Sequence, residues 1–142
     1  EELVMFKLGS RMQIKRRNRP IILLSTGVGI ATFRPVILAY ANNPSNVSQL
    51  INVNVDSSGD FVFRDELDQL ESESYKNYWV SSRAMFNELF ESLTGVESPI
   101  YYVVGSDLFV KEMIQRLRSK HVSDQDIVID KGEKVYHEFF GN

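Results

Sequence analysis

The sequence contains no cysteine among its 142 residues. Disulfides, thiolate metal sites, iron–sulfur ligation and a cysteine nucleophile are therefore all excluded. This composition is typical of an intracellular protein, and we expect a cytoplasmic location. The two histidines, His121 and His137, have no partners at ligand spacing, so we expect no metal site.

The chain also lacks a long hydrophobic run and an excess of positive charge. No apolar segment approaches the roughly 18 residues of a membrane span, and no signal-peptide pattern opens the chain, so we expect a soluble protein without a membrane span. Lys and Arg number 16 against 19 Asp and Glu, a net charge of -3, which argues against a nucleic-acid partner. One basic cluster, residues 15–19, is interpreted as a solvated connector, with docking of an acidic partner as the alternative.

Short apolar runs alternate with amphipathic stretches along the rest of the chain. We expect strands at residues 21–25, 47–55, 78–80, 100–104 and 127–129, and helices at 33–40, 63–70, 85–93 and 108–120. Because the strands are continuous apolar runs separated by helices, they predict a parallel sheet covered on both faces. The expected fold class is α/β, a doubly wound five-stranded parallel sheet in the order 3-2-1-4-5.

Glycines interrupt the chain where two of these strands end. Gly27 and Gly29 follow the first strand, and Gly105 follows the fourth. In the expected strand order both breaks face one crevice, at the switch point where such sheets bind ligands. Glycines let the backbone approach a ligand, and the N–H groups and positive dipole end of the following helix suit a phosphate. The alternative is a glycine turn that joins strand to helix and binds nothing.

The residues around these glycines are similar to a known family. Residues 27–34 resemble the Gly-Thr-Gly-Ile-Ala-Pro-Phe-Arg segment of the ferredoxin–NADP reductase superfamily, and residues 63–67, 80–83, 101–110 and 127–130 resemble later segments in the same order. The resemblance implies an NAD(P)-binding domain at residues 20–142, the C-terminal domain of that superfamily. It also implies that residues 1–19 are the end of a preceding flavin-binding barrel or a linker.

The resemblance further implies three groups of cofactor-binding residues. The pyrophosphate would lie at Thr26, Gly27, Val28, Gly29, Ile30 and Ala31, the adenosine ribose or its 2′-phosphate at Ser82 and Arg83, and the nicotinamide side at Gly105, Ser106 and Asp107. A guanidinium suits a 2′-phosphate, so Arg83 favours NADP over NAD; the alternative is an exposed arginine that ends a strand. Ser106 and Asp107 also form an ordinary helix N-cap, and both interpretations can hold together.

In this family a hydride passes from the nicotinamide to a flavin, so no side chain is expected to act as an acid or base. We expect a domain that binds NADP or NAD and delivers hydride to FAD on a flavin-binding domain of the same polypeptide, with an electron-acceptor protein as a further partner. Because the flavin barrel is not in this sequence, we expect binding without turnover. Departures from the family pattern favour an alternative, a non-redox regulatory module that binds a nucleotide; they are Val28, Thr32, Val104 and Asp130.

Two other folds share the doubly wound plan, those of flavodoxins and response regulators. A response regulator needs acidic residues after the first strand, where this chain has Ser25 and Thr26, and a flavodoxin has a different loop there. The aromatic tail at residues 135–140 is expected to pack on the sheet edge or on a neighbouring domain. The alternative that the resemblance implies is that the tail lies near the flavin and stacks on it.

Overall fold

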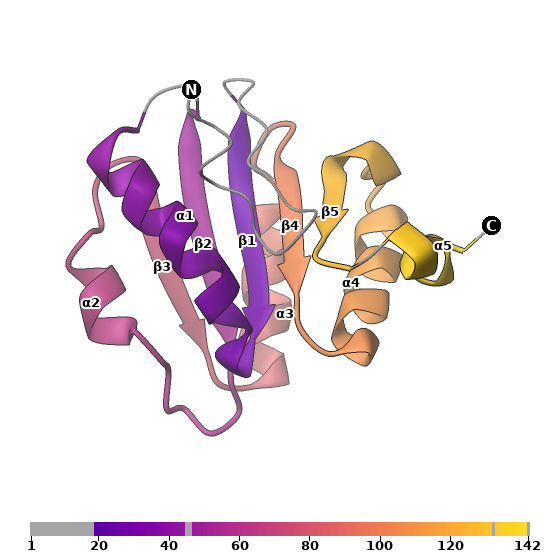
Figure 1. The fold of residues 1–142 in the computed structure, drawn as a ribbon, viewed down its shortest axis with the longest axis horizontal. Helices are drawn as coiled ribbons and strands as arrows, with labels where there is room; N and C mark the ends of the chain where they lie inside the picture. Colours follow the sequence, from indigo (N-terminus) through magenta and orange to yellow (C-terminus); the bar gives the residue numbers. More distant parts are fainter. Residues whose placement is uncertain (1–18, 45–46, 132, 142) are drawn as a thin grey trace.

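A single parallel sheet organises the chain in a computed structural model that describes residues 19–44, 47–131 and 133–141 (Figure 1). Its strand order is β3-β2-β1-β4-β5, which confirms the predicted doubly wound α/β fold. The neighbouring strands pair in parallel throughout. The strands are β1 (Pro20–Thr26), β2 (Gln49–Val55), β3 (Tyr75–Val80), β4 (Ile100–Val104) and β5 (Ile127–Ile129).

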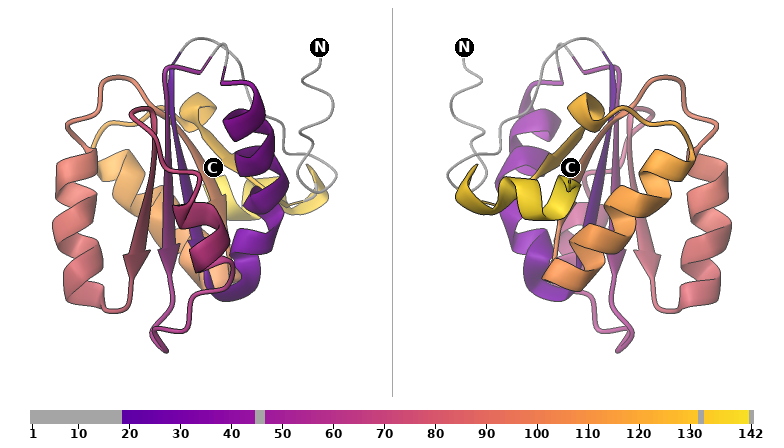
Figure 2. Two further views of the ribbon diagram at one scale, coloured as in Figure 1. Left: turned by 90° about the vertical axis from the view of Figure 1, so that its left-hand side faces the viewer. Right: turned by 90° about the vertical axis from the view of Figure 1, so that its right-hand side faces the viewer.

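Helices cover both faces of the sheet (Figure 2). One face carries α1 (Ile30–Asn42) and the short α2 (Arg64–Asp68), and the other carries α3 (Arg83–Leu93) and α4 (Asp107–Ser119). Two 3-10 turns, η2 (Gly27–Gly29) and η3 (Asp124–Asp126), precede α1 and β5. Because all five strands are parallel, their carboxyl ends lie at one edge of the sheet, the lower edge in Figure 1.

Several predicted boundaries were wrong. β3 begins at Tyr75 rather than at residue 78, because Tyr75 and Asn77 turn inward to hydrogen-bonding partners that a polar stretch of sequence does not indicate. β2 begins at Gln49 rather than at residue 47, and α1 begins at Ile30, three residues earlier than expected.

The aromatic tail forms a helix that the sequence reading did not predict, α5 (Glu133–Phe140), beside α4 at the β5 edge. Phe139 and Phe140 are buried in the same cluster as α4 and β5 residues. The expectation that these aromatics pack on the sheet edge is therefore confirmed.

The core under α3 and α4 is apolar. Along each strand, the side chains point alternately to the two faces of the sheet. Those on the α3–α4 face pack against three aromatic rings and several aliphatic side chains of these two helices. On this face lie Ile22, Leu24, Ile51, Val53, Val80, Phe86, Phe90, Phe109, Val110, Met113, Ile114 and Leu117. Burial of apolar surface is the main contribution to the stability of this layer.

The core under α1 and α2 contains polar residues at its β2–β3 side. Asn52, Asn54 and Asn77 are buried there among apolar neighbours. The Nδ2 of Asn52 donates to the Oδ1 of Asn77 at 2.9 Å, which joins the two strands through their side chains as well as through the backbone. A buried polar group is stable only where it is hydrogen-bonded, so this face depends on directional contacts.

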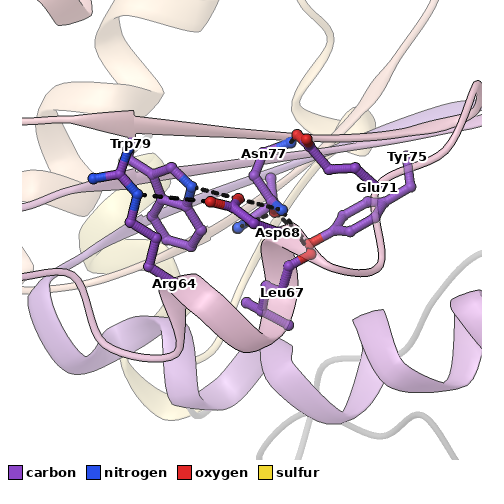
Figure 3. A network of polar contacts seen from close by, with 8 residues as sticks. Arg64, Leu67, Asp68, Glu71, Tyr75, Asn77 and Trp79 are labelled. Carbon is purple, nitrogen blue, oxygen red and sulfur yellow. Dashed lines mark hydrogen bonds and ion pairs between the residues drawn. The ribbon is translucent and has the colours of Figure 1, made fainter.

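The same network holds α2 in place, as Figure 3 shows. Asn77 Nδ2 donates to the carbonyl of Leu67 at 2.9 Å, and Trp79 Nε1 donates to Asp68 Oδ1 at 2.8 Å. Tyr75 donates its hydroxyl proton to Asn77 Oδ1, and burial raises the pKa of that phenol. A helix of five residues is not stable alone, so these contacts and the burial of Leu67 account for its formation.

Across the described ranges, the helices are too short or too polar to pass through a lipid bilayer. The predicted barrel end or linker at residues 1–19 lies outside the described residues except for Arg19. Arg19 Nη2 lies 3.1 Å from Asp126 Oδ2, and Arg19 Nε donates to the carbonyl of Ser98 at 2.8 Å.

Candidate functional site

The first predicted group forms the turn between β1 and α1. Thr26 is extended, Gly27 has a φ of 52°, and the chain enters α1 at Ile30. A Cβ on Gly27 would meet no atom within 4 Å, so the turn is open on that side. The positive φ is what requires glycine at this position.

The N-terminus of α1 carries no neutralising group. Gly29 occupies the N-cap position without a side-chain hydrogen bond, and no acidic residue lies in the first turn. The N–H of Ile30 donates to the carbonyl of Val28, and the positive end of the helix dipole has no side-chain acceptor in the first turn, an arrangement that favours an anion. Val28 and Ala31 are exposed at this turn.

The two glycine breaks meet, as predicted. A Cβ on Gly29 would lie 3.2 Å from Val104 Cγ1, and a Cβ on Gly105 would lie 2.5 Å from Thr26 Oγ1. Gly105 is therefore needed for close approach of the loops that leave β1 and β4, which are adjacent strands at the switch in strand order. The two loops that were expected to border one crevice thus pack against each other at this edge of the sheet.

The loop after β4 is held by three polar contacts. Ser106 Oγ accepts a hydrogen bond from the N–H of Phe109 at 3.1 Å, which confirms the predicted N-cap of α4. Lys131 Nζ lies 3.0 Å from Asp107 Oδ1 and donates to the carbonyl of Gly105 at 3.4 Å. Sequence reasoning missed Lys131, although its position just after β5 places it at the same edge of the sheet.

Asp130 precedes that lysine and is partly buried. Burial raises the pKa of its carboxyl group, and the neighbouring Lys131 partly offsets this effect.

Ser82 and Arg83 lie at the start of α3. Ser82 Oγ caps the helix by accepting a hydrogen bond from the N–H of Met85 at 3.1 Å. Arg83 is 74% exposed, and its Nη1 donates to Glu112 Oε2 of α4 at 3.1 Å. The arginine therefore links two helices across the carboxyl edge of the sheet.

These residues line a hollow of about 200 Å³. Its other lining residues come from the end of β2, the end of β3 and one side of α3 and α4: Val55, Ser57, Ser81, Phe86, Phe109 and Glu112. Sequence reasoning missed Ser57, Phe109 and Glu112. Phe109 and Glu112 are three residues apart on α4 and so share a face, a signal that could have indicated them.

The hollow and the glycine corner adjoin at Phe109. A Cβ on Gly105 would lie 2.7 Å from Phe109 Cδ2, and the same ring lines the hollow. All three predicted groups thus lie along the carboxyl edge of the sheet, from Arg83 to the turn at Gly27.

Arg34, the last residue of the matching segment, is engaged elsewhere. Its Nε and Nη2 donate to the two carboxylate oxygens of Glu66 at 2.8 and 2.7 Å, and its guanidinium lies 5.0 Å from the ring centre of Phe63. These hydrogen bonds lower the pKa of Glu66. Arg34 therefore joins α1 to α2 through Glu66, and to Phe63, the residue that precedes α2.

In the ranges that the structure describes, no group of three or more acidic or histidine side chains is placed to hold a metal ion.

Comparison with known proteins gives matches at the level of structure. No family model matches the sequence, and no curated protein matches it. Flavohemoglobin from Malassezia yamatoensis, solved with bound FAD and heme, matches with a TM-score of 0.62 at 14% identity, over 80% of this chain and 31% of that one. The ferredoxin reductase of carbazole 1,9a-dioxygenase matches with a TM-score of 0.57 at 15% identity, over 80% of this chain and 37% of that one.

The chain thus spans about a third of the length of both solved structures. At these identities the likeness concerns the path of the chain. It agrees with the doubly wound order of the strands. The chain therefore has the fold of a ferredoxin-reductase-like C-terminal domain.

Proposed function

We propose that this chain is the pyridine-nucleotide-binding domain of a flavoprotein oxidoreductase. It binds NADP or NAD at the carboxyl edge of the sheet and presents the nicotinamide to FAD on another domain of the same polypeptide. The final electron acceptor is a separate protein. The observation that carries the proposal is the uncapped N-terminus of α1 directly beside Gly105, at the switch point of a doubly wound sheet.

The glycine corner suits a pyrophosphate in shape and charge. Gly27 leaves open space where a side chain would stand, and the first turn of α1 has no acidic residue to repel an anion. The N–H groups of Ile30 and Ala31 lie at the positive end of the helix. Together these features support assigning the pyrophosphate to residues 26–31.

The hollow beside it suits the adenosine half. Phe86 and Phe109 supply apolar wall, and Ser57, Ser82 and Arg83 supply hydrogen-bond donors. A 2′-phosphate on the ribose would compete with Glu112 for the guanidinium of Arg83, which is an exposed and therefore weak ion pair. Because that exposed pair is weak, Arg83 stays available to a 2′-phosphate, which supports NADP as the ligand with Arg83 as the residue that selects it.

The nicotinamide side is bounded by Gly105, Ser106 and Asp107. When bound, the nucleotide supplies the hydride, and the protein's residues bind and orient it. Two large apolar side chains, Val28 and Leu108, are 76% and 78% exposed on either side of the corner. Such exposed apolar groups suit contact with a second domain that carries the flavin.

A second function, a non-redox module that binds the same nucleotide, draws support from Val28. This exposed side chain stands where the superfamily pattern has a threonine hydroxyl, so one polar contact to the nucleotide is absent. Both functions require nucleotide binding and differ in whether a bound flavin is reduced. Anaerobic mixing of the full-length protein with NADPH separates them, because bleaching of flavin absorbance occurs only in the reductase.

The experiment that tests the proposal is calorimetric titration of this chain with NADPH and NADH. We expect micromolar affinity for NADPH and a selective loss of that affinity in Arg83→Ala. Lys120→Ala is the matched control, because Lys120 also forms an exposed ion pair between α4 and α3, with Glu91 at 3.0 Å, but at the opposite end of these helices.

Loss of NADPH affinity in Arg83→Ala but not in Lys120→Ala would support a 2′-phosphate site. Equal loss in both variants would mean that only net charge matters and would remove Arg83 from the site. Failure of the parent chain to bind either nucleotide at millimolar concentration would overturn the proposed function.

A further inference from the structure

A buried asparagine lies directly beneath the glycine corner. Asn54, on β2, is fully buried, and its Nδ2 donates to the carbonyl oxygen of Gly27 at 3.1 Å and to Ser25 Oγ at 2.9 Å. Only the nitrogen of the amide can donate to a carbonyl, so the contact with Gly27 also decides which way the amide faces. The side chain thereby joins the second strand of the sheet to the turn that follows the first.

The contact has a consequence for the peptide unit between Gly27 and Val28. No peptide bond in the described chain is cis, and in a trans peptide the N–H points opposite to the carbonyl. Because Asn54 holds the Gly27 carbonyl toward the sheet, the N–H of Val28 points away from the sheet. The exposed side chain of Val28 agrees with a residue that lies on the outer side of the turn.

Among the described residues, this peptide is held by the backbone of the η2 turn, where the N–H of Ile30 donates to the carbonyl of Val28, and by the side chain of Asn54 at the carbonyl of Gly27. A Cβ on Gly27 would meet nothing within 4 Å, and the N-cap of α1 makes no side-chain hydrogen bond. Gly27 can adopt many backbone conformations, so an anchor is needed to hold it at a φ of 52°. Asn54 provides such an anchor.

Stability alone does not explain an asparagine here. The Oδ1 of Asn54 is buried and has no hydrogen-bond partner among the described residues. A buried polar atom without a partner makes a fold less stable than an apolar side chain at the same position would. The preceding residue, Val53, is equally buried on the other face of the sheet and is aliphatic. The amide is therefore best explained by what its nitrogen does for the turn.

We infer that Asn54 is a positioning residue that directs the N–H of Val28, and with it the N–H groups entering α1, toward the crevice where an anion binds. The inference rests on the proposed function only in naming that anion as the pyrophosphate of a pyridine nucleotide. Asn54 itself touches the turn from below and does not contact the ligand.

Asn54→Ala tests this inference, with Asn52→Ala as the matched control. Asn52 is the same residue type on the same strand, is equally buried and also has an unpaired Oδ1, but its Nδ2 donates to Asn77 rather than to the turn. Two quantities are measured in each variant: the backbone amide order parameters at residues 28–31 of the free chain, from ¹⁵N relaxation, and the affinity for NADPH by calorimetry.

We expect lower order parameters at residues 28–31 in Asn54→Ala only, because the turn loses its anchor, and NADPH affinity about fivefold to tenfold lower in that variant, the effect of one lost hydrogen bond. Asn52→Ala should leave both quantities at their parent values although it weakens the fold. Equal changes in the two variants, or no change in either, would overturn the inference. Where alanine prevents folding, Asn54→Thr and Asn52→Thr carry the same expectations, because threonine suits a strand and lacks the amide.

The two proposals fail in different ways. If the order parameters of the turn fall in Asn54→Ala but the parent chain binds no nucleotide, the proposed function fails and the positioning role stands. If the parent binds NADPH and Asn54→Ala binds it equally well with unchanged order parameters at the turn, the positioning role fails and the proposed function stands.

Discussion

The two faces of the sheet are built by different means. Under α3 and α4 the layer is apolar throughout, whereas under α1 and α2 three buried asparagines link β2, β3 and the turn after β1. Apolar packing is strong but non-directional, and hydrogen bonds are weaker in net terms but specify direction. We conclude that the face next to the glycine corner holds the backbone in a defined orientation through hydrogen bonds.

The largest effect on stability is expected from removing an aromatic side chain of the apolar face. Phe90 is 1% exposed and packs against Phe86, with ring centres 5.7 Å apart, and against the guanidinium of Arg116. Phe90→Ala should lower the free energy of unfolding by about 3–5 kcal/mol, measured by urea denaturation, because it leaves a cavity. A loss below about 1 kcal/mol would contradict the view that this face is held by packing.

A smaller and more local effect is expected from the hydrogen-bonded face. Asn77→Ala removes the partner of Asn52, Tyr75 and the carbonyl of Leu67, and should lower the free energy of unfolding by about 2 kcal/mol. Amide exchange in α2 should rise more than exchange in α3. Lys76→Ala, an exposed neighbour on the same strand, is the control; uniform exchange across both helices in Asn77→Ala would contradict the comparison.

The smallest effect is expected from the ion pair that ties α1 to α2. The lowered pKa of Glu66 means that the pair stabilises the fold above the ordinary carboxyl pKa and that this contribution is lost as the pH falls through the lowered value. In Arg34→Gln the pKa of Glu66 should rise toward its ordinary value and this part of the pH dependence should vanish. Carboxyl NMR titration measures it, and an unchanged pKa in the variant would contradict the assignment.

Much of the fold follows from local pattern. Continuous apolar runs separated by helices were sufficient for the strand order, and the two glycine breaks were sufficient to predict that Gly27 and Gly105 lie at one edge. The early start of β3 was missed because Tyr75 and Asn77 lie in a polar stretch, and the burial of Asn77 depends on Asn52, which is 25 residues away.

The candidate site shows the same division. Residues on the turns were found because glycine and N-cap positions carry a local signal. Asn54, Lys131 and Glu112 were not, because each acts through a contact with a residue at least 24 positions away: Gly27, Asp107 and Arg83. Such contacts exist only once the strands are ordered, and no spacing along the chain indicates them.

We have proposed that the carboxyl edge between β1 and β4 binds a pyridine nucleotide. The most direct test of this proposal is a two-dimensional amide NMR titration of this chain with NADPH. We expect changes in the amide chemical shifts of residues 26–31, of Ser82 and Arg83, and of residues 105–107. Changes confined to the hollow at the opposite edge of the sheet, lined by Thr94, Tyr101 and His121 among others, or no changes at millimolar NADPH, would contradict it.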